Sequence, residues 1–106
     1  MSNAPPIDIR QDHWEIVSAI LEKHVPQYEI LFFGSRAKWT AREFSDLDLA
    51  VITDTPLPLA VLADMNEEFS ESDLPFKVDV VDWATVGEGF KKVIKLDGVR
   101  SPLKPE

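Results

Sequence analysis

The segment from position 46 to position 52 places the strongest constraint on the fold. Its sequence, Asp-Leu-Asp-Leu-Ala-Val-Ile, alternates acidic and aliphatic residues and then becomes wholly apolar. Because successive side chains of a β-strand point to opposite faces, Asp46 and Asp48 share one face while Leu47 and Leu49 point into a core. The segment is therefore predicted to be a strand with one end exposed to a site.

The paired carboxylates predict a metal site. Like charges held this close are costly unless a cation neutralises them, and oxygen ligands without histidine or cysteine select Mg²⁺ or Mn²⁺. Asp79, flanked by Val78 and Val80 on another apolar segment, is predicted to complete the cluster from a neighbouring strand. Three carboxylates suit two divalent ions. Asp82 is the competing third ligand, although its offset from Asp79 places it on the opposite face of a regular strand.

The first part of the chain has the pattern of a helix followed by a strand. Apolar residues recur at helical spacing from Asp12 to Val25, and Asp12 with Glu15 is predicted to form a capping box. The continuous apolar run at 29–33 has the length and composition of a buried strand.

Two further helices and a strand are predicted after position 52. Residues 55–58 form a loop that leads into a helix, and residues 77–82 have the pattern of a third strand. Thr85 with Glu88 is predicted to open a last helix that ends at Gly98. This order predicts an α/β (α+β) fold with a small mixed β-sheet flanked by about three helices. The direction of each strand relative to its neighbour is left open.

Gly34 and Ser35 directly follow the predicted strand at 29–33. A glycine there lets the backbone approach a ligand, and a serine can start a short helix whose N–H groups bind phosphate. Arg36 and Lys38 are candidates for holding the same phosphates, although basic loop residues are as often simply solvated. Phosphates, metals and carboxylates together predict phosphoryl or nucleotidyl transfer, with Asp79 as the candidate proton acceptor.

These residues resemble a known family. The segments 34–38 (Gly-Ser-Arg-Ala-Lys) and 44–49 (Phe-Ser-Asp-Leu-Asp-Leu), with ten residues between Ser35 and Asp46, resemble the Gly-Ser, ten-residue gap, Asp-x-Asp motif of polymerase-beta-type nucleotidyltransferases. More narrowly, they resemble the minimal nucleotidyltransferase (MNT) group, from about the first helix to Asp82.

The resemblance implies a nucleotidyltransferase fold and a role for each motif residue. It implies that Gly34 and Ser35 contact a triphosphate, that Asp46 and Asp48 bind metal, and that Asp79 is the third carboxylate.

The resemblance also implies a reaction and a partner. The donor is expected to be ATP, the transferred group AMP and the product pyrophosphate. The partner is expected to be a HEPN ribonuclease toxin, with the chain acting as an antitoxin that adds AMP to a tyrosine of that toxin. One departure is visible, because many relatives have Gly-Ser-Arg-Ala-Arg-Gly where this chain has Lys38 and Trp39.

The composition predicts one modest domain spanning 1–106. The chain has 106 residues, 44% of them hydrophobic, which suffices for one core. The ordered core is predicted to span about residues 10–98. The tail at 99–106 has two prolines and no apolar periodicity, so it is predicted to be flexible.

The composition also excludes several classes of site and partner. The absence of cysteine excludes disulfides and thiolate sites, and two histidines cannot make a histidine-rich zinc site. The chain lacks a signal-peptide pattern and any apolar run approaching roughly 20 residues, so we expect a cytoplasmic protein with no membrane partner. A net charge of −8 should repel phosphate backbones, so no direct nucleic-acid partner is expected.

The small size of the chain bears on the acceptor. One small domain leaves little surface to enclose an acceptor, so part of the acceptor pocket should come from a partner chain or a second subunit. A HEPN toxin in a hetero-oligomer fits that role. Two other functions stay open: nucleotidylation of a small molecule by a homodimer, and a non-enzymatic antitoxin that masks its partner by binding.

Overall fold

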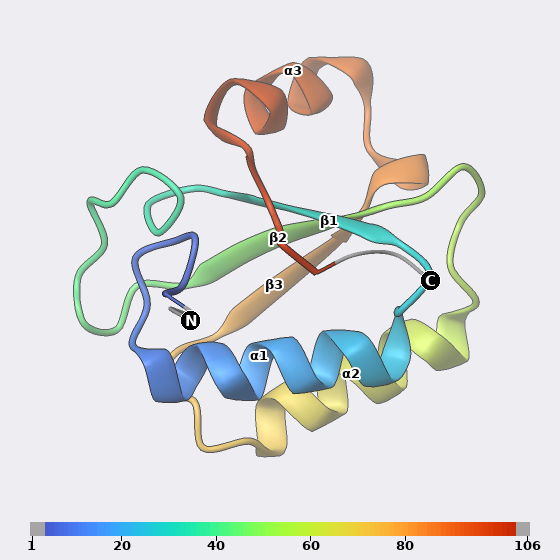
Figure 1. Ribbon diagram of the computed structural model, residues 1–106. Helices are drawn as coiled ribbons and strands as arrows, with labels where there is room; N and C mark the ends of the chain where they lie inside the picture. The colour runs from blue at the N-terminus through green and yellow to red at the C-terminus, as the bar shows by residue number, and fades with distance from the viewer. Residues whose placement is uncertain (1–3, 104–106) are drawn as a thin grey trace.

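A four-stranded mixed sheet with helices on both faces forms the centre of the protein (Figure 1). The computed structural model describes residues 4–103, and its α/β architecture is the one predicted. The elements in chain order are α1 (Gln11–His24), β1 (Glu29–Phe33), β2 (Leu47–Ile52), α2 (Leu59–Glu71), β3 (Val78–Asp82), the 3-10 turn η1 (Trp83–Thr85), α3 (Glu88–Asp97) and β4 (Val99–Arg100). No helix within residues 4–103 combines the length and the apolar character needed to cross a membrane.

The strand order is β3-β2-β1-β4. Strand β1 is antiparallel to both β2 and β4, whereas β2 and β3 are parallel and are connected through α2. In this register Phe33 lies opposite Asp48, and Asp48 lies opposite Asp79. The end of β1 and the beginnings of β2 and β3 therefore meet at one end of the sheet.

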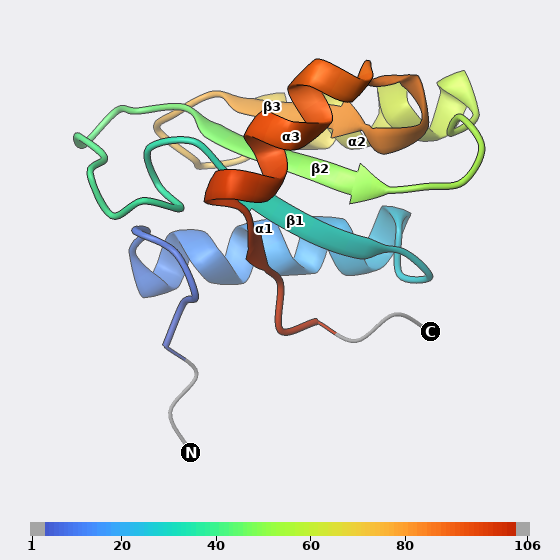
Figure 2. The ribbon, with the colours of Figure 1, turned by 90° about the horizontal axis from the view of Figure 1, so that it is seen from above.

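The two faces of the sheet carry cores of different size. Helices α1 and α2 cover one face and α3 covers the other (Figures 1 and 2). Successive side chains of each strand point to opposite faces of the sheet, so each strand contributes residues to both cores. The larger core, beside α1 and α2, includes Trp14, Val17, Leu21, Phe32, Leu47, Leu49, Val51 and Met65. The smaller core beneath α3 consists of the buried residues Phe33, Ala50 and Ile94 with partly buried neighbours.

Neither predicted capping box forms. Helix α1 begins at Gln11 with Arg10 as its N-cap, and the Asp12 carboxylate, already inside the first turn, pairs with Arg10 at 2.9 Å. Helix α3 begins at Glu88 with Gly87 as its N-cap. Thr85 lies in η1 instead, where its hydroxyl donates a hydrogen bond to the carbonyl oxygen of Asp82 at 2.8 Å. The predicted helices are present, but their first turns are held by other contacts.

The prediction of a flexible tail at 99–106 is wrong for the residues that the structure describes. Strand β4 pairs with β1, and the Ser101 N–H donates a hydrogen bond to the Ile30 carbonyl at 2.9 Å. Leu103 packs against the larger core. Without β4, the backbone groups on that side of β1 would be left unpaired at a sheet edge. Residues 104–106 lie outside the described range.

Packing also begins earlier than the predicted boundary near residue 10. Ile7 is fully buried in the larger core. The Asp8 N–H donates a hydrogen bond to the Arg36 carbonyl at 2.8 Å. The segment before α1 is thus attached to the loop that follows β1.

Candidate active site

The sheet register brings Gly34, Asp48 and Asp79 together. Gly34 follows the last residue of β1, next to Asp48 on β2 and then Asp79 on β3. Gly34 has φ of +78°, in the left-handed region that favours glycine. A Cβ at this position would overlap the Asp48 carboxylate. Only glycine lets the chain turn this close to the acid.

Asp48 is the electrostatic centre of the site. Burial raises the pKa of its carboxyl to about 6, and the negative charges of Asp79 and Asp46 act in the same direction. Asp79 lies directly opposite Asp48 in the register of β2 and β3. The Lys77 ammonium lies 3.2 Å from an Asp79 carboxylate oxygen and supplies a positive charge beside the pair. The site thus concentrates negative charge that the protein only partly neutralises.

Asp46 precedes β2 and is exposed. It acts on Asp48 through its charge, as Asp79 does from the adjacent strand. Within residues 4–103, no three acidic, histidine or cysteine side chains stand close enough together to hold one ion. A shared ion therefore requires the Asp46 carboxylate to approach the Asp48–Asp79 pair. The all-oxygen donor set and the unneutralised charge fit a hard divalent cation.

Asp82 belongs to a different part of the molecule. Its carboxylate is buried, accepts a hydrogen bond from the Leu57 N–H at 2.7 Å and accepts another from the Thr53 hydroxyl. These contacts fix the loop between β2 and α2. Asp82 is therefore a structural residue and does not join the carboxylate cluster.

The segment after Gly34 forms a turn where a short helix was predicted. The Lys38 N–H donates to the Gly34 carbonyl at 3.1 Å, and the Thr40 N–H donates to the Ser35 carbonyl at 3.0 Å. Ser35 is half-buried, and its hydroxyl has no hydrogen-bond partner in the part of the chain that the structure describes. The hydroxyl is therefore free to bind a ligand.

Arg36 is a structural residue, which contradicts its predicted role in nucleotide binding. Only 5% of the residue is exposed, and its guanidinium donates to the carbonyl oxygens of Asp8, Ser45 and Glu43 at 2.8, 3.0 and 3.1 Å. The guanidinium also lies 4.1 Å from the centroid of the Phe76 ring. With its N–H groups committed to the backbone, Arg36 cannot reach a phosphate without dismantling these contacts.

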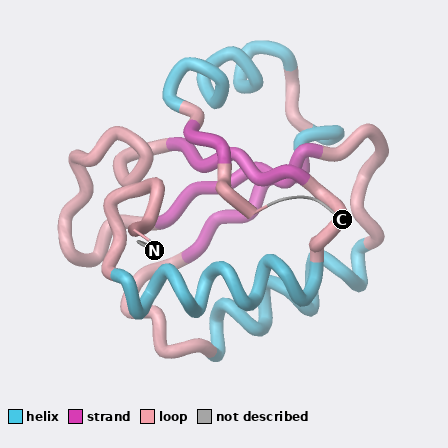
Figure 3. The backbone as a smooth tube through the Cα atoms, in the orientation of Figure 1, coloured by secondary structure: helices cyan, strands magenta, loops and turns pink. Residues whose placement is uncertain are grey.

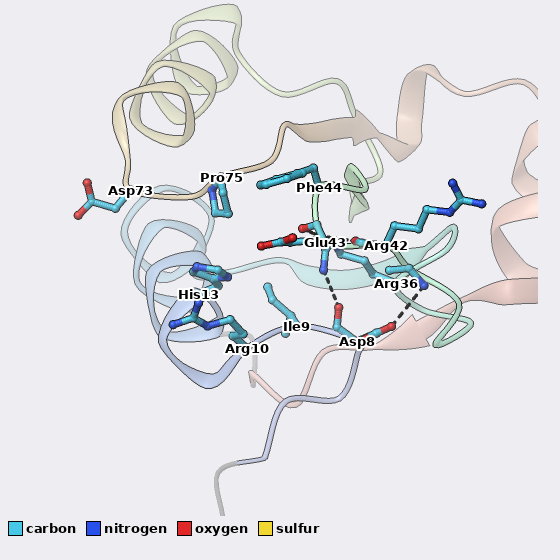
Figure 4. A pocket seen from close by; sticks show the side chains of 11 residues that line it. Asp8, Ile9, Arg10, His13, Arg36, Arg42, Glu43, Phe44, Asp73 and Pro75 are labelled. Atoms are coloured by element: carbon cyan, nitrogen blue, oxygen red, sulfur yellow. Dashed lines mark hydrogen bonds between the residues drawn. The ribbon is translucent and has the colours of Figure 1, made fainter.

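The contacts of Arg36 hold the loop that leads into Asp46. Figure 4 shows Asp8 below this loop, with dashed lines for the hydrogen bond from Arg36 and for a second one from the Ala41 N–H. A cavity of about 540 Å³ lies beside them. It is lined by residues of the N-terminal segment, the 41–44 loop and the turn at 73–75, and by none of the three site carboxylates. The cavity is thus separate from the carboxylate cluster.

Lys38 and Trp39 continue the turn toward α3. The Lys38 ammonium lies 3.3 Å from a carboxylate oxygen of Asp97 on α3 and forms no ion pair with the site aspartates. Trp39 is 57% exposed and has φ of +60°, and it is the only non-glycine residue with positive φ within residues 4–103. The left-handed conformation explains why a glycine is suited to this position.

Lys77 is the site residue that sequence reasoning missed. The available signal was its spacing, because a residue two positions before Asp79 lies on the same face of an extended segment. Gly34, Ser35 and Asp46 belong to the single loop between β1 and β2, which lies at one end of the sheet (Figure 3).

Sequence comparison places the chain in a family. The model of the family "Polymerase beta, Nucleotidyltransferase" matches residues 15–100. The chain belongs to this nucleotidyltransferase family. It is also 44% identical over 95 residues to the probable protein adenylyltransferase MntA of Haemophilus influenzae, a match that covers 90% of this chain and 83% of MntA.

Solved structures share the nucleotidyltransferase fold. A chain in the crystal structure of a toxin–antitoxin complex with AMP-PNP has a TM-score of 0.69 and 22% identity, with 87% of this chain and 73% of that chain covered. A chain in the complex of tri-AMPylated Shewanella oneidensis HEPN toxin with MNT antitoxin has a TM-score of 0.66 and 20% identity, with 92% and 74% covered. At these identities the similarity is one of fold.

Proposed function

We propose that this chain is a magnesium-dependent protein adenylyltransferase. It transfers AMP from ATP to a tyrosine hydroxyl of a HEPN ribonuclease toxin and thereby acts as an antitoxin. The observation that carries the proposal is the meeting of Gly34, Asp48 and Asp79 at one end of the sheet. The 44% identity to a probable protein adenylyltransferase supports the choice of reaction.

Each residue of the cluster has a role in this proposal. The backbone at Gly34 and the free hydroxyl of Ser35 bind the phosphates of ATP. Asp46, Asp48 and Asp79 hold one or two Mg²⁺ ions, for which Mn²⁺ is an alternative. When bound, the metal neutralises phosphate charge and stabilises the attacking and leaving oxygens. Arg36 holds the loop that positions Asp46.

The transfer is a displacement at phosphorus. The acceptor oxygen forms a bond to the α-phosphorus of ATP, and the bond from that phosphorus to the oxygen bridging the α- and β-phosphates breaks. Pyrophosphate leaves with the bonding electrons, and Asp79 accepts the proton of the acceptor hydroxyl. Asp79 suits this role because it is half-exposed, so an approaching acceptor can reach it.

A protein acceptor is consistent with the chain and with its relatives. The described domain consists of one sheet and three helices, with no further element to enclose a small acceptor over the carboxylates. Among the structural relatives, one complex contains a HEPN toxin carrying three AMP groups together with an MNT antitoxin.

The test is intact-mass spectrometry of a purified HEPN-type toxin. That protein is incubated with the chain, ATP and Mg²⁺, next to a parallel reaction with the Asp46→Asn, Asp48→Asn variant. We expect mass increases of one or more AMP units with the wild type and none with the variant. A matched control, Asp64→Asn with Glu67→Gln, removes two exposed charges from α2 and should transfer AMP normally.

The outcomes separate the proposal from its alternatives. A tight complex without AMP transfer would favour an antitoxin that masks its partner by binding. AMP transfer to a small molecule by a homodimer, with an unmodified HEPN protein, would favour the small-molecule enzyme. Equal AMP transfer by the wild type and the Asp46→Asn, Asp48→Asn variant would show that these two carboxylates are not required for the reaction.

A further inference from the structure

Helix α3 carries an exposed apolar stripe formed by Phe90, Val93 and Leu96. Their exposed fractions are 45%, 49% and 85%, and they are three of the six large hydrophobic residues that are exposed within residues 4–103. Because the three positions are spaced by three residues, they line one side of the helix. Ile94 already anchors α3 to the sheet. Phe90 also contacts the sheet through Phe33, whereas Val93 and Leu96 are not needed to attach the helix.

The α3 stripe borders the candidate active site. Helix α3 covers one face of the sheet (Figure 2). Asp48 lies on that face because it alternates with Leu47 and Leu49 of the larger core and shares its side of β2 with Ala50. The Phe90 and Phe33 ring centroids are 5.7 Å apart, and Phe33 lies opposite Asp48 in the sheet. At the other end of the helix, Asp97 pairs with Lys38 of the turn after β1. A molecule that covers the α3 stripe therefore also reaches the edge of the site.

We propose that the α3 stripe is the docking surface for the protein that accepts AMP. This inference rests on the proposed function and names the surface through which the acceptor is held. From Phe90 to Leu96 the stripe is about 9 Å long at 1.5 Å per residue, so it extends further than a single nucleotide base covers. Contiguous exposed apolar side chains beside a polar site are typical of protein–protein contacts.

The charge distribution specifies the chemistry of the partner. Residues 91–106 contain five basic and two acidic residues, whereas the first ninety contain six basic and seventeen acidic residues. Lys92 is exposed and lies one helical turn from Leu96. An acceptor with an apolar patch bordered by acidic side chains is attracted to α3 and repelled by the rest of the chain. The orientation that this favours holds the acceptor against α3, at the border of the carboxylate site.

The test compares two exposed leucines. Leu96 on α3 is 85% exposed and Leu59 at the start of α2 is 84% exposed. Each is changed to glutamate, and the affinity of each variant for the HEPN-type toxin used in the AMP-transfer test is measured by calorimetry without ATP. We expect Leu96→Glu to weaken binding by about 10-fold or more, as for an interface residue that matters. Leu59→Glu should bind like the wild type.

The measurement separates docking from transfer. The Asp46→Asn, Asp48→Asn variant should bind the HEPN-type protein at least as tightly as the wild type, because it leaves the α3 stripe intact and removes two negative charges. Weaker binding by Leu96→Glu in a system that transfers no AMP would support the docking surface and reject the proposed function. Wild-type affinity of Leu96→Glu, equal losses in both glutamate variants, or failure of the wild-type chain to bind would overturn the docking surface. The docking surface would also be overturned if light scattering showed that Leu96→Glu dissociates a homodimer while the affinity for the HEPN-type protein stays unchanged.

Discussion

At the scale of single residues, Asp48 is where the fold and the proposed chemistry conflict. The carboxyl is half-buried beside two other acids, so its charged form is unfavourable until a cation binds. Its pKa in the folded protein is about 6, above the ordinary value of 3.8. The folded protein therefore retains a proton that the unfolded chain releases, and the metal-free protein loses stability as pH rises from about 4 to 6.

Asp48→Asn is accordingly expected to stabilise the metal-free protein at neutral pH. With allowance for solvent screening at a half-buried site, we expect about 1 kcal/mol, or about 4–8 °C in Tm, at pH 7.5 in EDTA. The gain should disappear at about pH 3, below both pKa values, where the wild-type carboxyl is largely protonated in the folded and the unfolded state. Thermal unfolding followed by circular dichroism at both pH values measures it, with Asp64→Asn on α2 as the control. An Asp48→Asn variant that is less stable than the wild type at pH 7.5 would contradict the conclusion that burial and like-charge repulsion make the ionised Asp48 side chain unfavourable.

Trp39 is a second residue that lowers the stability of the fold, because its backbone is in the left-handed conformation. Such a conformation costs an L-residue about 1–2 kcal/mol and glycine almost nothing. We expect Trp39→Gly to be more stable than Trp39→Ala by about 1 kcal/mol, because both variants lose the ring and only alanine keeps the strain. The urea midpoints, compared at equal m-values, measure the difference. An alanine variant at least as stable as the glycine variant would mean that position 39 does not need a positive φ.

At the scale of elements, the loop between β1 and β2 depends on one buried cation. Arg36 joins the N-terminal segment to the 42–45 backbone through three carbonyl oxygens. We expect Arg36→Lys to destabilise the protein by about 2–3 kcal/mol, because an ammonium cannot satisfy the same planar set of acceptors. Arg42→Lys, on an exposed residue of the same loop, should change stability by less than about 0.5 kcal/mol. Urea denaturation measures both, and similar values for the two variants would reject the bracing role.

The elements were largely predictable from the sequence, whereas their attachments were not. The apolar run at 29–33 and the alternation after Asp46 depend on local periodicity, and both are strands in the structure. Strand β4 has two residues and is held by pairing with β1, a contact between segments far apart in sequence. The residues around position 99 give no sign of this pairing with β1, so the sequence predicts a flexible tail.

The same distinction applies to the site. The alternation after Asp46 and the acid at position 79 predicted a cluster of Asp46, Asp48 and Asp79 beside the phosphate contact at Gly34. The sheet register brings Gly34, Asp48 and Asp79 together, whereas Asp46 lies before β2, and within residues 4–103 the three carboxylates do not form one ion site. The role of Arg36 was mispredicted because a basic side chain beside Gly-Ser suggests phosphate binding. Its burial depends on Asp8 and Phe76, which are distant in sequence and carry no local signal.

At the scale of the whole molecule, negative charge is spread over the surface and concentrated at one end of the sheet. The net charge of −8 means that any salt reduces self-repulsion, so a rise in Tm with added Mg²⁺ would not by itself identify a metal site. If Asp46, Asp48 and Asp79 form a site, bound Mg²⁺ stabilises the folded protein further, by an amount that depends on the ion and not on ionic strength. Screening and specific binding can be separated because Na⁺ screens the surface charge but does not bind the site.

We therefore expect MgCl₂ to raise Tm more than NaCl does at equal ionic strength and pH 7.5. Binding to the folded state alone adds about 2.7 kcal/mol when the free metal is at 100 times its Kd. In the Asp46→Asn, Asp48→Asn variant the two salts should act equally, because only screening of the remaining surface charge is left. Differential scanning fluorimetry with the Asp64→Asn, Glu67→Gln control distinguishes the loss of these two carboxylates from the loss of any two charges. Equal effects of the two salts on the wild type would mean that the carboxylates bind Mg²⁺ only together with the phosphates of ATP.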